Sequence, residues 1–103
     1  MATLESIRKG CIIFKTPDNI HNNYGIQIYN EKDNSMVDLF DEACYAWFRK
    51  IKEICDIDIR WFHQGRTNDW SYFEFWNGVP YQDMILDFAE SLSKVFDISL
   101  EIE

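Results

Sequence analysis

The sequence has little of what would indicate a membrane protein or a disulfide scaffold. No apolar run approaches the roughly 20 residues of a membrane span, and the first ten residues lack the apolar stretch of a signal peptide. Three cysteines, Cys11, Cys44 and Cys55, are an odd number without C-x-x-C spacing. We therefore expect a cytoplasmic protein with reduced cysteines, and we place Cys44 and Cys55 on the apolar side of a helix.

The sequence also lacks a cluster of cations and any known catalytic motif. Ten Lys or Arg stand against 18 Asp or Glu, a net charge of −8, and the ten cations are dispersed along the chain. Nucleic acid is disfavoured as a ligand because phosphate repels such a body. His21 and His63 have no ligand-type neighbours at metal-binding spacing, so we expect no metal or cofactor. The protein is predicted not to be an enzyme.

Glycine and proline are scarce, and aromatic residues are abundant. Four Gly and two Pro accompany 17 % aromatic and 47 % apolar residues in 103 positions. This apolar content excludes a disordered chain, and the length suits one hydrophobic core. The prediction is a single domain over residues 1–103.

The first half of the chain predicts two strands and a long helix. After a short helical opening, residues 11–15 read as a strand, 16–23 as a loop and 24–30 as a second strand. Ser35 is the expected N-cap of a helix over 35–55, with Asp38 three residues later. Its apolar stripe is predicted to contain Val37, Phe40, Cys44, Trp47, Ile51 and Ile54.

The same order of elements returns in the second half. Residues 57–62 alternate as a strand, 64–69 form a polar loop and 70–76 form another strand. Pro80 is expected as the first residue of a second helix, whose stripe runs from Met84 to Phe96. A last strand covers 98–102. The fold class is therefore α+β, a mainly antiparallel sheet with two helices on one face, in the order β-β-α-β-β-α-β with a possible internal β-β-α repeat.

Strand alternation predicts which side chains occupy the sheet face that the helices leave uncovered. Rings with polar handles and charged groups share this face, and Tyr and Trp supply much of the binding energy at protein interfaces. The predicted residues of this face are Gln27, Tyr29, Asp58, Arg60, Phe62, Tyr72, Glu74 and Trp76. The same rings are also compatible with simple cross-strand pairing.

Acidic residues lie on the polar side of the first predicted helix, and a net charge of −8 attracts basic partners over long distances. These acids and the rings above form the predicted partner-binding set. Its members are Tyr29, Asp58, Tyr72, Glu74, Trp76, Asp38, Asp41 and Glu42.

In size, charge and this pairing of acids with rings, the chain resembles small acidic bacterial immunity proteins and antitoxins, of which the barstar-like ribonuclease inhibitors are the familiar case. The resemblance implies a one-to-one complex with a basic, nuclease-type toxin whose active site the protein occludes. Barstar-like inhibitors have a parallel sheet, unlike the sheet expected here.

Three alternatives remain open from the sequence. His63, Arg66, Asp69 and Glu74 could perform acid–base chemistry on a phosphodiester, which would make the protein a small nuclease. A phage inhibitor of host defence, of the DNA-mimic or anti-CRISPR type, would also be small and acidic. The aromatic sheet face could instead pair with a second copy of the chain as a homodimer.

Overall fold

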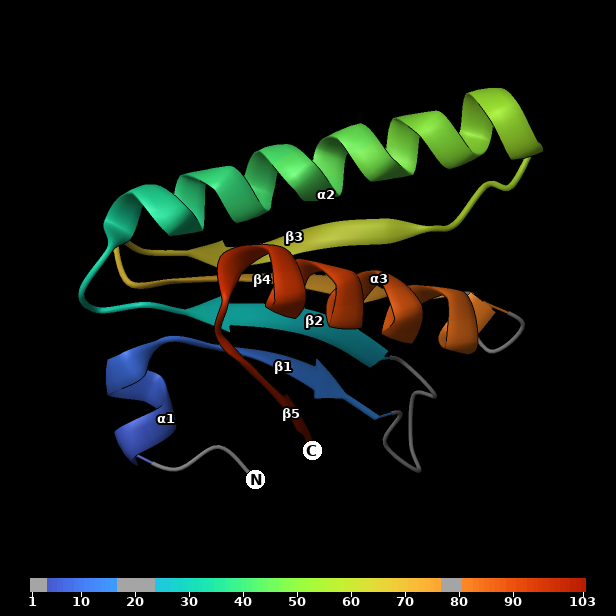
Figure 1. The fold of residues 1–103 in the computed structure, drawn as a ribbon. Coiled ribbons are helices and arrows are strands. Elements are labelled where there is room, and N and C mark those ends of the chain that lie inside the picture. The colour runs from blue at the N-terminus through green and yellow to red at the C-terminus, as the bar shows by residue number, and fades with distance from the viewer. Residues whose placement is uncertain (1–3, 17–23, 77–80) are drawn as a thin grey trace.

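The computed structural model describes residues 4–16, 24–76 and 81–103. Helices α2 and α3 lie on one face of a five-stranded sheet whose strand order is β3-β4-β2-β1-β5 (Figure 1). The elements in chain order are α1 (Leu4–Lys9), β1 (Cys11–Lys15), β2 (Tyr24–Tyr29), α2 (Asn34–Cys55), β3 (Trp61–Arg66), β4 (Trp70–Phe75), α3 (Gln82–Phe96) and β5 (Ser99–Ile102).

The sheet is mixed. Strands β1 and β2, β2 and β4, and β3 and β4 pair antiparallel, and β5 pairs parallel to β1. The predicted α+β class and the order β-β-α-β-β-α-β are confirmed. Pro80 and most of the predicted loop 16–23 lie outside the described residues.

The two β-β-α units are arranged symmetrically in the sheet. Strands β2 and β4 pair at the centre, α2 packs over β4 of the second unit, and α3 packs over β1 of the first. Two copies of one β-β-α unit related by a two-fold axis would produce this arrangement. The arrangement therefore agrees with the hypothesis of an internal repeat.

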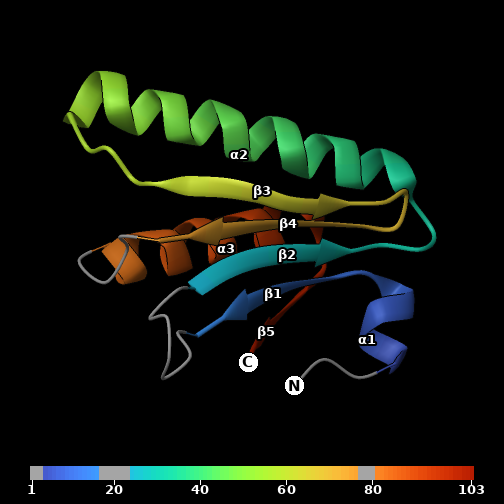
Figure 2. The same cartoon turned by 180° about the vertical axis from the view of Figure 1, so that it is seen from behind.

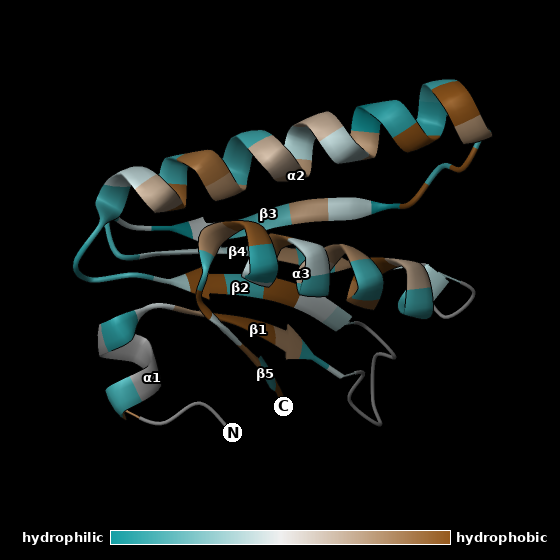
Figure 3. Cartoon of the chain, viewed as in Figure 1, coloured by the Kyte–Doolittle hydropathy of each residue, from teal (hydrophilic) through white to brown (hydrophobic). Residues whose placement is uncertain are grey.

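The core lies between the helices and the sheet. Phe40 of α2 packs against Phe73 of β4 with ring centroids 6.0 Å apart, and both rings are fully buried. Trp47 stacks on Phe88 at 4.3 Å and joins α2 to α3. Figure 3 shows β1 and β2 largely hydrophobic, whereas both long helices alternate between hydrophobic and hydrophilic residues. These amphipathic helices supply one side of the core.

Helix α2 starts within one residue of the predicted position, but the predicted N-cap, Ser35, was wrong by two residues. The helix begins at Asn34 with Asp33 in the cap position, and the Ser35 hydroxyl donates a hydrogen bond to Asp33 Oδ1 rather than capping the helix. The Asn30 side chain accepts hydrogen bonds from the backbone N–H groups of Lys32 and Asp33, and this turn places Asp33 at the cap.

The predicted apolar stripe of α2 was wrong at its C-terminal end. Phe48 is buried in the stripe, whereas Ile54 and Cys55 are exposed. The last turn of α2 projects beyond the sheet (Figure 1), so side chains there have no strand beneath them. Cys44 is buried, as predicted.

The predicted strand over residues 57–62 was placed too early. Strand β3 covers Trp61–Arg66, and residues 57–60 connect it to α2, with only the Arg60 carbonyl oxygen accepting a backbone hydrogen bond from the far end of β4, at Trp76. Ile57 and Ile59 alternate because they pack against the core, and Ile59 is buried. A β-bulge between His63 and Gly65 lets the strand continue into the predicted polar loop.

Helices leave the opposite sheet face uncovered over β2 and β4 (Figure 2). Rings on this face lie flat over glycines: a Cβ atom on Gly25 would come within 2.5 Å of Tyr72, and one on Gly65 within 2.6 Å of Trp70. Glycine is therefore required at both positions by close packing on the sheet surface.

Candidate functional site

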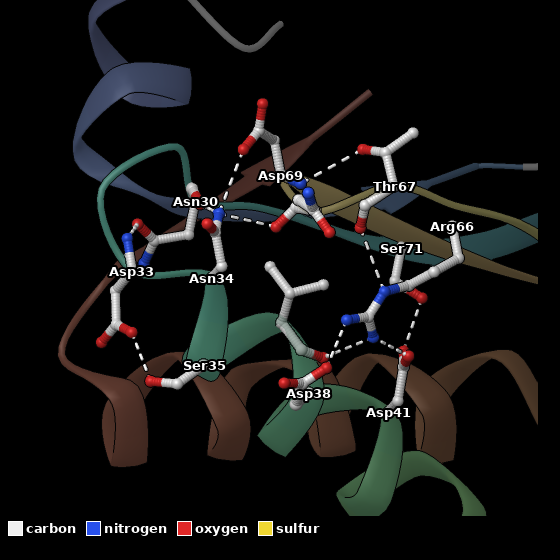
Figure 4. A network of polar contacts seen from close by, with 12 residues as sticks. Asn30, Asp33, Asn34, Ser35, Asp38, Asp41, Arg66, Thr67, Asp69 and Ser71 are labelled. Atoms are coloured by element: carbon white, nitrogen blue, oxygen red, sulfur yellow. Dashed lines mark hydrogen bonds and ion pairs between the residues drawn. The ribbon is translucent and has the colours of Figure 1, made fainter.

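Two turns meet at one end of the molecule and hold each other in place. The turn between β2 and α2 contacts the turn between β3 and β4 through the Asn30 N–H, which donates to the Asp69 carbonyl oxygen at 2.8 Å. The Asn34 side-chain amide donates to the Asn68 carbonyl oxygen at 2.7 Å and to Asp69 Oδ1 at 3.0 Å (Figure 4). These bonds fix the Asp69 carboxylate relative to the start of α2.

Arg66 at the end of β3 joins the sheet to α2. Its guanidinium donates to Asp38 through Nη2 and to Asp41 through Nη1, one helical turn apart on α2 (Figure 4). Hydrogen bonding to Asp38 is the main cause that raises the pKa of Arg66 above its ordinary value, with a further contribution from Asp41. The bulge in β3 brings Arg66 to the helix-covered face, because one extra residue shifts the alternation of all that follow.

The carboxylates of Asp33, Asp38 and Asp69 define what we call the acidic turn site. All three residues are exposed, and each uses Oδ1 in a hydrogen bond within the protein. A carboxylate accepts up to about four hydrogen bonds, so each retains capacity for a further donor. Tyr29 and Trp70 pair across the strands beside these turns, on the uncovered sheet face, and both are partly exposed.

The local charge of this end of the molecule is negative. Residues 30–41 together with 66–69 contain Glu31, Asp33, Asp38, Asp41 and Asp69 against Lys32 and Arg66, which gives −5 + 2 = −3.

A chain of hydrogen bonds continues from Asp41 into the protein. Ser71 Oγ contacts Asp41 Oδ1 at 2.5 Å and His63 Nε2 at 2.7 Å, and the Tyr45 hydroxyl contacts His63 Nδ1 at 2.8 Å. A carboxylate only accepts, so Ser71 donates to Asp41 and accepts from Nε2–H of His63. In the neutral imidazole, Nδ1 then accepts from Tyr45. Burial raises the pKa of Tyr45, and the Asp41 charge adds to this effect.

This chain has the residue types of a Ser-His-Asp triad but not its geometry. In a triad the carboxylate orients the histidine, whose other nitrogen activates the serine. Here the carboxylate accepts directly from Ser71, and the second ring nitrogen of His63 faces Tyr45. Ser71 is fully buried, which closes it to a substrate. The hydrogen-bond chain therefore links α2 to the sheet.

The structure separates the four residues of the predicted nuclease site. His63 pairs with Phe73 on the helix-covered face, where its ring stacks on Phe73 at 4.2 Å. Glu74 is the next residue of β4 and lies on the opposite face, with its carboxylate contacting the Gln64 amide. Arg66 is held by α2, and Asp69 belongs to the acidic turn site.

The predicted partner-binding rings all lie on the uncovered sheet face, but at separate places on it. Tyr29 lies beside the acidic turn site, and Tyr72 lies over Gly25 with Lys15 Nζ 4.8 Å above its ring. Trp76, 53 % exposed, stacks on Phe62 at 5.7 Å near β3. Glu74 is only partly exposed between them.

The predicted acids are divided between several surroundings. Asp38 is 67 % exposed within the acidic turn site, but Asp41 is only 14 % exposed and faces the sheet, so its assignment to a solvated face was wrong. Glu42 is exposed on α2. Asp58 lies in the connection before β3, with one oxygen 3.9 Å from Lys52 Nζ, and does not belong to a strand.

Sequence reasoning missed the residues that make the two turns one site. Asp33 was not singled out, Asp69 was considered only for catalysis, and Asn30, Asn34 and Trp70 were not considered for binding. The available signal was the density of polar residues in both turns, but only the antiparallel pairing of β2 with β4 brings those turns together.

Comparisons with protein-family models, curated proteins and solved structures gave no match. Within the described residues, no helix combines the length and apolar character needed to cross a membrane. No group of three or more His, Cys, Asp or Glu side chains in the same residues is arranged to hold a metal ion.

Proposed function

We propose that this protein is a non-catalytic inhibitor that binds a basic protein partner and occludes that partner's active site, as an immunity protein does with a nuclease-type toxin. The proposal rests on the acidic turn site. Its three exposed carboxylates already accept hydrogen bonds before any partner arrives: Asp38 and Asp69 from distant parts of the chain, and Asp33 from Ser35 in the same turn.

Preorganisation is what gives these carboxylates an advantage over the other exposed acids. A side chain that is already ordered loses little conformational entropy on binding, and this cost otherwise reaches about 0.5–1.5 kcal/mol for each immobilised side chain. Asp83, Asp87 and Glu90 are exposed acids on the outer side of α3, outside the acidic turn site, and they are the comparison set in the test below.

Rings next to the carboxylates supply contact area. Tyr29 and Trp70 are paired on the uncovered sheet face, directly adjacent in sequence to Asn30 and Asp69 of the two turns. A cationic side chain that reaches Asp69 is therefore close to two aromatic faces, which also attract cations.

The mechanism under this proposal is electrostatic and steric. The net charge of −8 steers a basic partner toward the protein. The acidic turn site then occupies positions that substrate phosphates would take, and the adjoining rings exclude water. The complex contains one partner for each chain.

A pair of charge-matched variants tests the proposal. The triple variant Asp33→Asn, Asp38→Asn, Asp69→Asn and the control Asp83→Asn, Asp87→Asn, Glu90→Gln each raise the net charge by three and keep side-chain size. Each is used with the wild type to capture proteins from the native host, including the products of adjacent genes. A partner identified by mass spectrometry is then purified for affinity and activity assays.

We expect a basic partner that the wild type and the control variant bind and inhibit. The turn variant should bind it at least about tenfold more weakly, and association should slow as salt is raised. The proposal is wrong if the partner is acidic, if it keeps full activity in the complex, or if both triple variants bind it equally.

A further inference from the structure

Strand β3 is an end strand of the sheet, and among the described residues no strand pairs with its outer edge. Trp76 N–H donates to the Arg60 carbonyl oxygen at 3.0 Å, which fixes the bonding alternation between β3 and β4. In an antiparallel pair, residues that bond inward alternate with residues that point outward. The backbone groups of Trp61 and His63 therefore point away from β4, toward the outer edge.

Aromatic side chains flank this edge on both faces of the sheet. Phe62, 47 % exposed, stacks with Trp76 on the uncovered face. Trp61 and Tyr45 contact each other on the helix-covered face at 5.2 Å, and each remains partly exposed. An end strand with exposed rings on both faces is a template for pairing with another chain.

Helix α2 presents one of its sides above the same edge. Phe40 faces β4 below, and Trp47 faces α3 on one side. Tyr45 faces β3 on the other side, through its hydrogen bond to His63 and its contact with Trp61. The side of α2 that carries Tyr45 therefore looks outward beyond β3.

The charges along this side of α2 are self-complementary. Spacings of four and three residues place Asp38, Glu42, Tyr45, Arg49 and Lys52 on one helical stripe. Two acids precede Tyr45 by three and seven residues, and two cations follow it by four and seven. When two such helices lie antiparallel across a two-fold axis at Tyr45, Glu42 faces Arg49 and Asp38 faces Lys52.

We propose that a second copy of this chain docks on the β3 edge, so that the two sheets join into one ten-stranded sheet across a two-fold axis. Phe62 then lies on the axis on the uncovered face, opposite Phe62 of the second copy. Tyr45 lies close to the same axis on the helix-covered face, since it contacts both Trp61 and His63.

The spacing between the two α2 helices suits charged side chains. Two copies of β3 put β4 of one chain about three strand spacings, or about 14 Å, from β4 of the other. Because α2 packs over β4 and its Phe48 ring also stacks on Trp61 of β3, the helices are separated by this distance or somewhat less. Glu–Arg and Asp–Lys pairs have the length to bridge this separation, which is too wide for direct helix packing at about 8–10 Å. In this dimer Asp38 of each acidic turn site faces Lys52 of the second copy, while Asp33 and Asp69 precede or lie off the helical stripe that pairs. The dimer does not depend on the proposed function.

Charge exchange between Glu42 and Arg49 tests this interface. Sedimentation equilibrium at about 0.15 M salt measures self-association of the wild type, of Glu42→Arg, of Arg49→Glu and of the double variant. Each single change sets like charges against each other twice in the dimer, and the double change restores opposite charges. Lys50→Glu and Glu90→Arg repeat the same charge changes at other exposed positions.

We expect a wild-type dimer, a dissociation constant at least about tenfold higher for each single variant, and recovery to within about threefold in the double variant. The two controls should behave as the wild type. Circular dichroism confirms that all variants fold. A monomeric wild type, a higher oligomer, or a double variant as weak as the single ones would overturn the proposal.

A disulfide measures the strand register independently. Phe62→Cys is combined with Cys55→Ala, which removes the exposed native thiol. Directly opposed residues that do not exchange hydrogen bonds have Cβ atoms close enough for a disulfide. A covalent dimer should form in a glutathione buffer, whereas Ile102→Cys, also combined with Cys55→Ala and exposed on the other edge of the sheet, should remain monomeric. The reverse result would place the second copy on β5 and overturn the proposal.

Discussion

Replacing Arg66 by Met should destabilise the fold by about 2–3 kcal/mol, mainly through Asp41. Asp41 is 14 % exposed, and the change removes the guanidinium that pairs with its carboxylate, leaving the Ser71 hydroxyl as a donor. Hydrogen bonds to charged groups contribute about 1.5–3 kcal/mol when shielded. Asp38 is 67 % exposed, so its share is about 0–1 kcal/mol.

Urea unfolding followed by tryptophan fluorescence measures this loss, since the chain has four Trp. Asp38→Asn should lower the free energy of unfolding by less than about 1 kcal/mol. Lys50→Met, which removes an exposed cation from α2, should change it by less than about 0.5 kcal/mol.

A double-mutant cycle separates the partners of Arg66. In Arg66→Met combined with Asp41→Asn, the two losses should fall short of additivity by at least about 1 kcal/mol, because both changes remove the same contact. The reasoning is refuted if Arg66→Met costs less than about 1 kcal/mol, or if Asp38 couples to Arg66 more strongly than Asp41 does.

Two further predictions concern buried groups. Burial raises the pKa of the Cys11 thiol from 9.0 to about 11, and that of Cys44 well above the ordinary value. The unfolded chain therefore loses these protons first, so the free energy of unfolding should fall above pH 9 by up to about 1.4 kcal/mol per pH unit for each thiol. Cys44→Ala should reduce this slope and Cys55→Ala should not; equal slopes in both variants would contradict the assignment. Gly25→Ala should cost about 1–3 kcal/mol in urea unfolding, because the new Cβ atom would lie 2.5 Å from the Phe73 carbonyl oxygen and from the Tyr72 ring; a neutral effect would show that this strand pair can separate.

Local patterns in the sequence determined the elements and their order. The apolar stripes of α2 and α3 and the alternation in β1, β2 and β4 arise from short spacings, which depend only on neighbours along the chain. The same alternation predicted the uncovered face over β2 and β4, although Gln27 on it is buried, and it was wrong for Asp58 and Arg60, which precede β3. Where local patterns and tertiary contacts disagree, the prediction was wrong: Ile57 and Ile59 alternate like a strand, but Ile59 is buried and Ile57 partly buried by packing against the core and not by strand pairing.

Only the tertiary structure decided which polar residues act together. Arg66 is 28 positions from Asp38 and 25 from Asp41, and a bulge in β3 was needed to turn it toward α2. The acidic turn site likewise needs β2 beside β4, because that pairing alone brings Asn30 to Asp69. Hydrophobic periodicity specifies which face of an element is buried but carries no information on which strand becomes its neighbour. Strand order, and with it the site, is therefore a property of the folded chain.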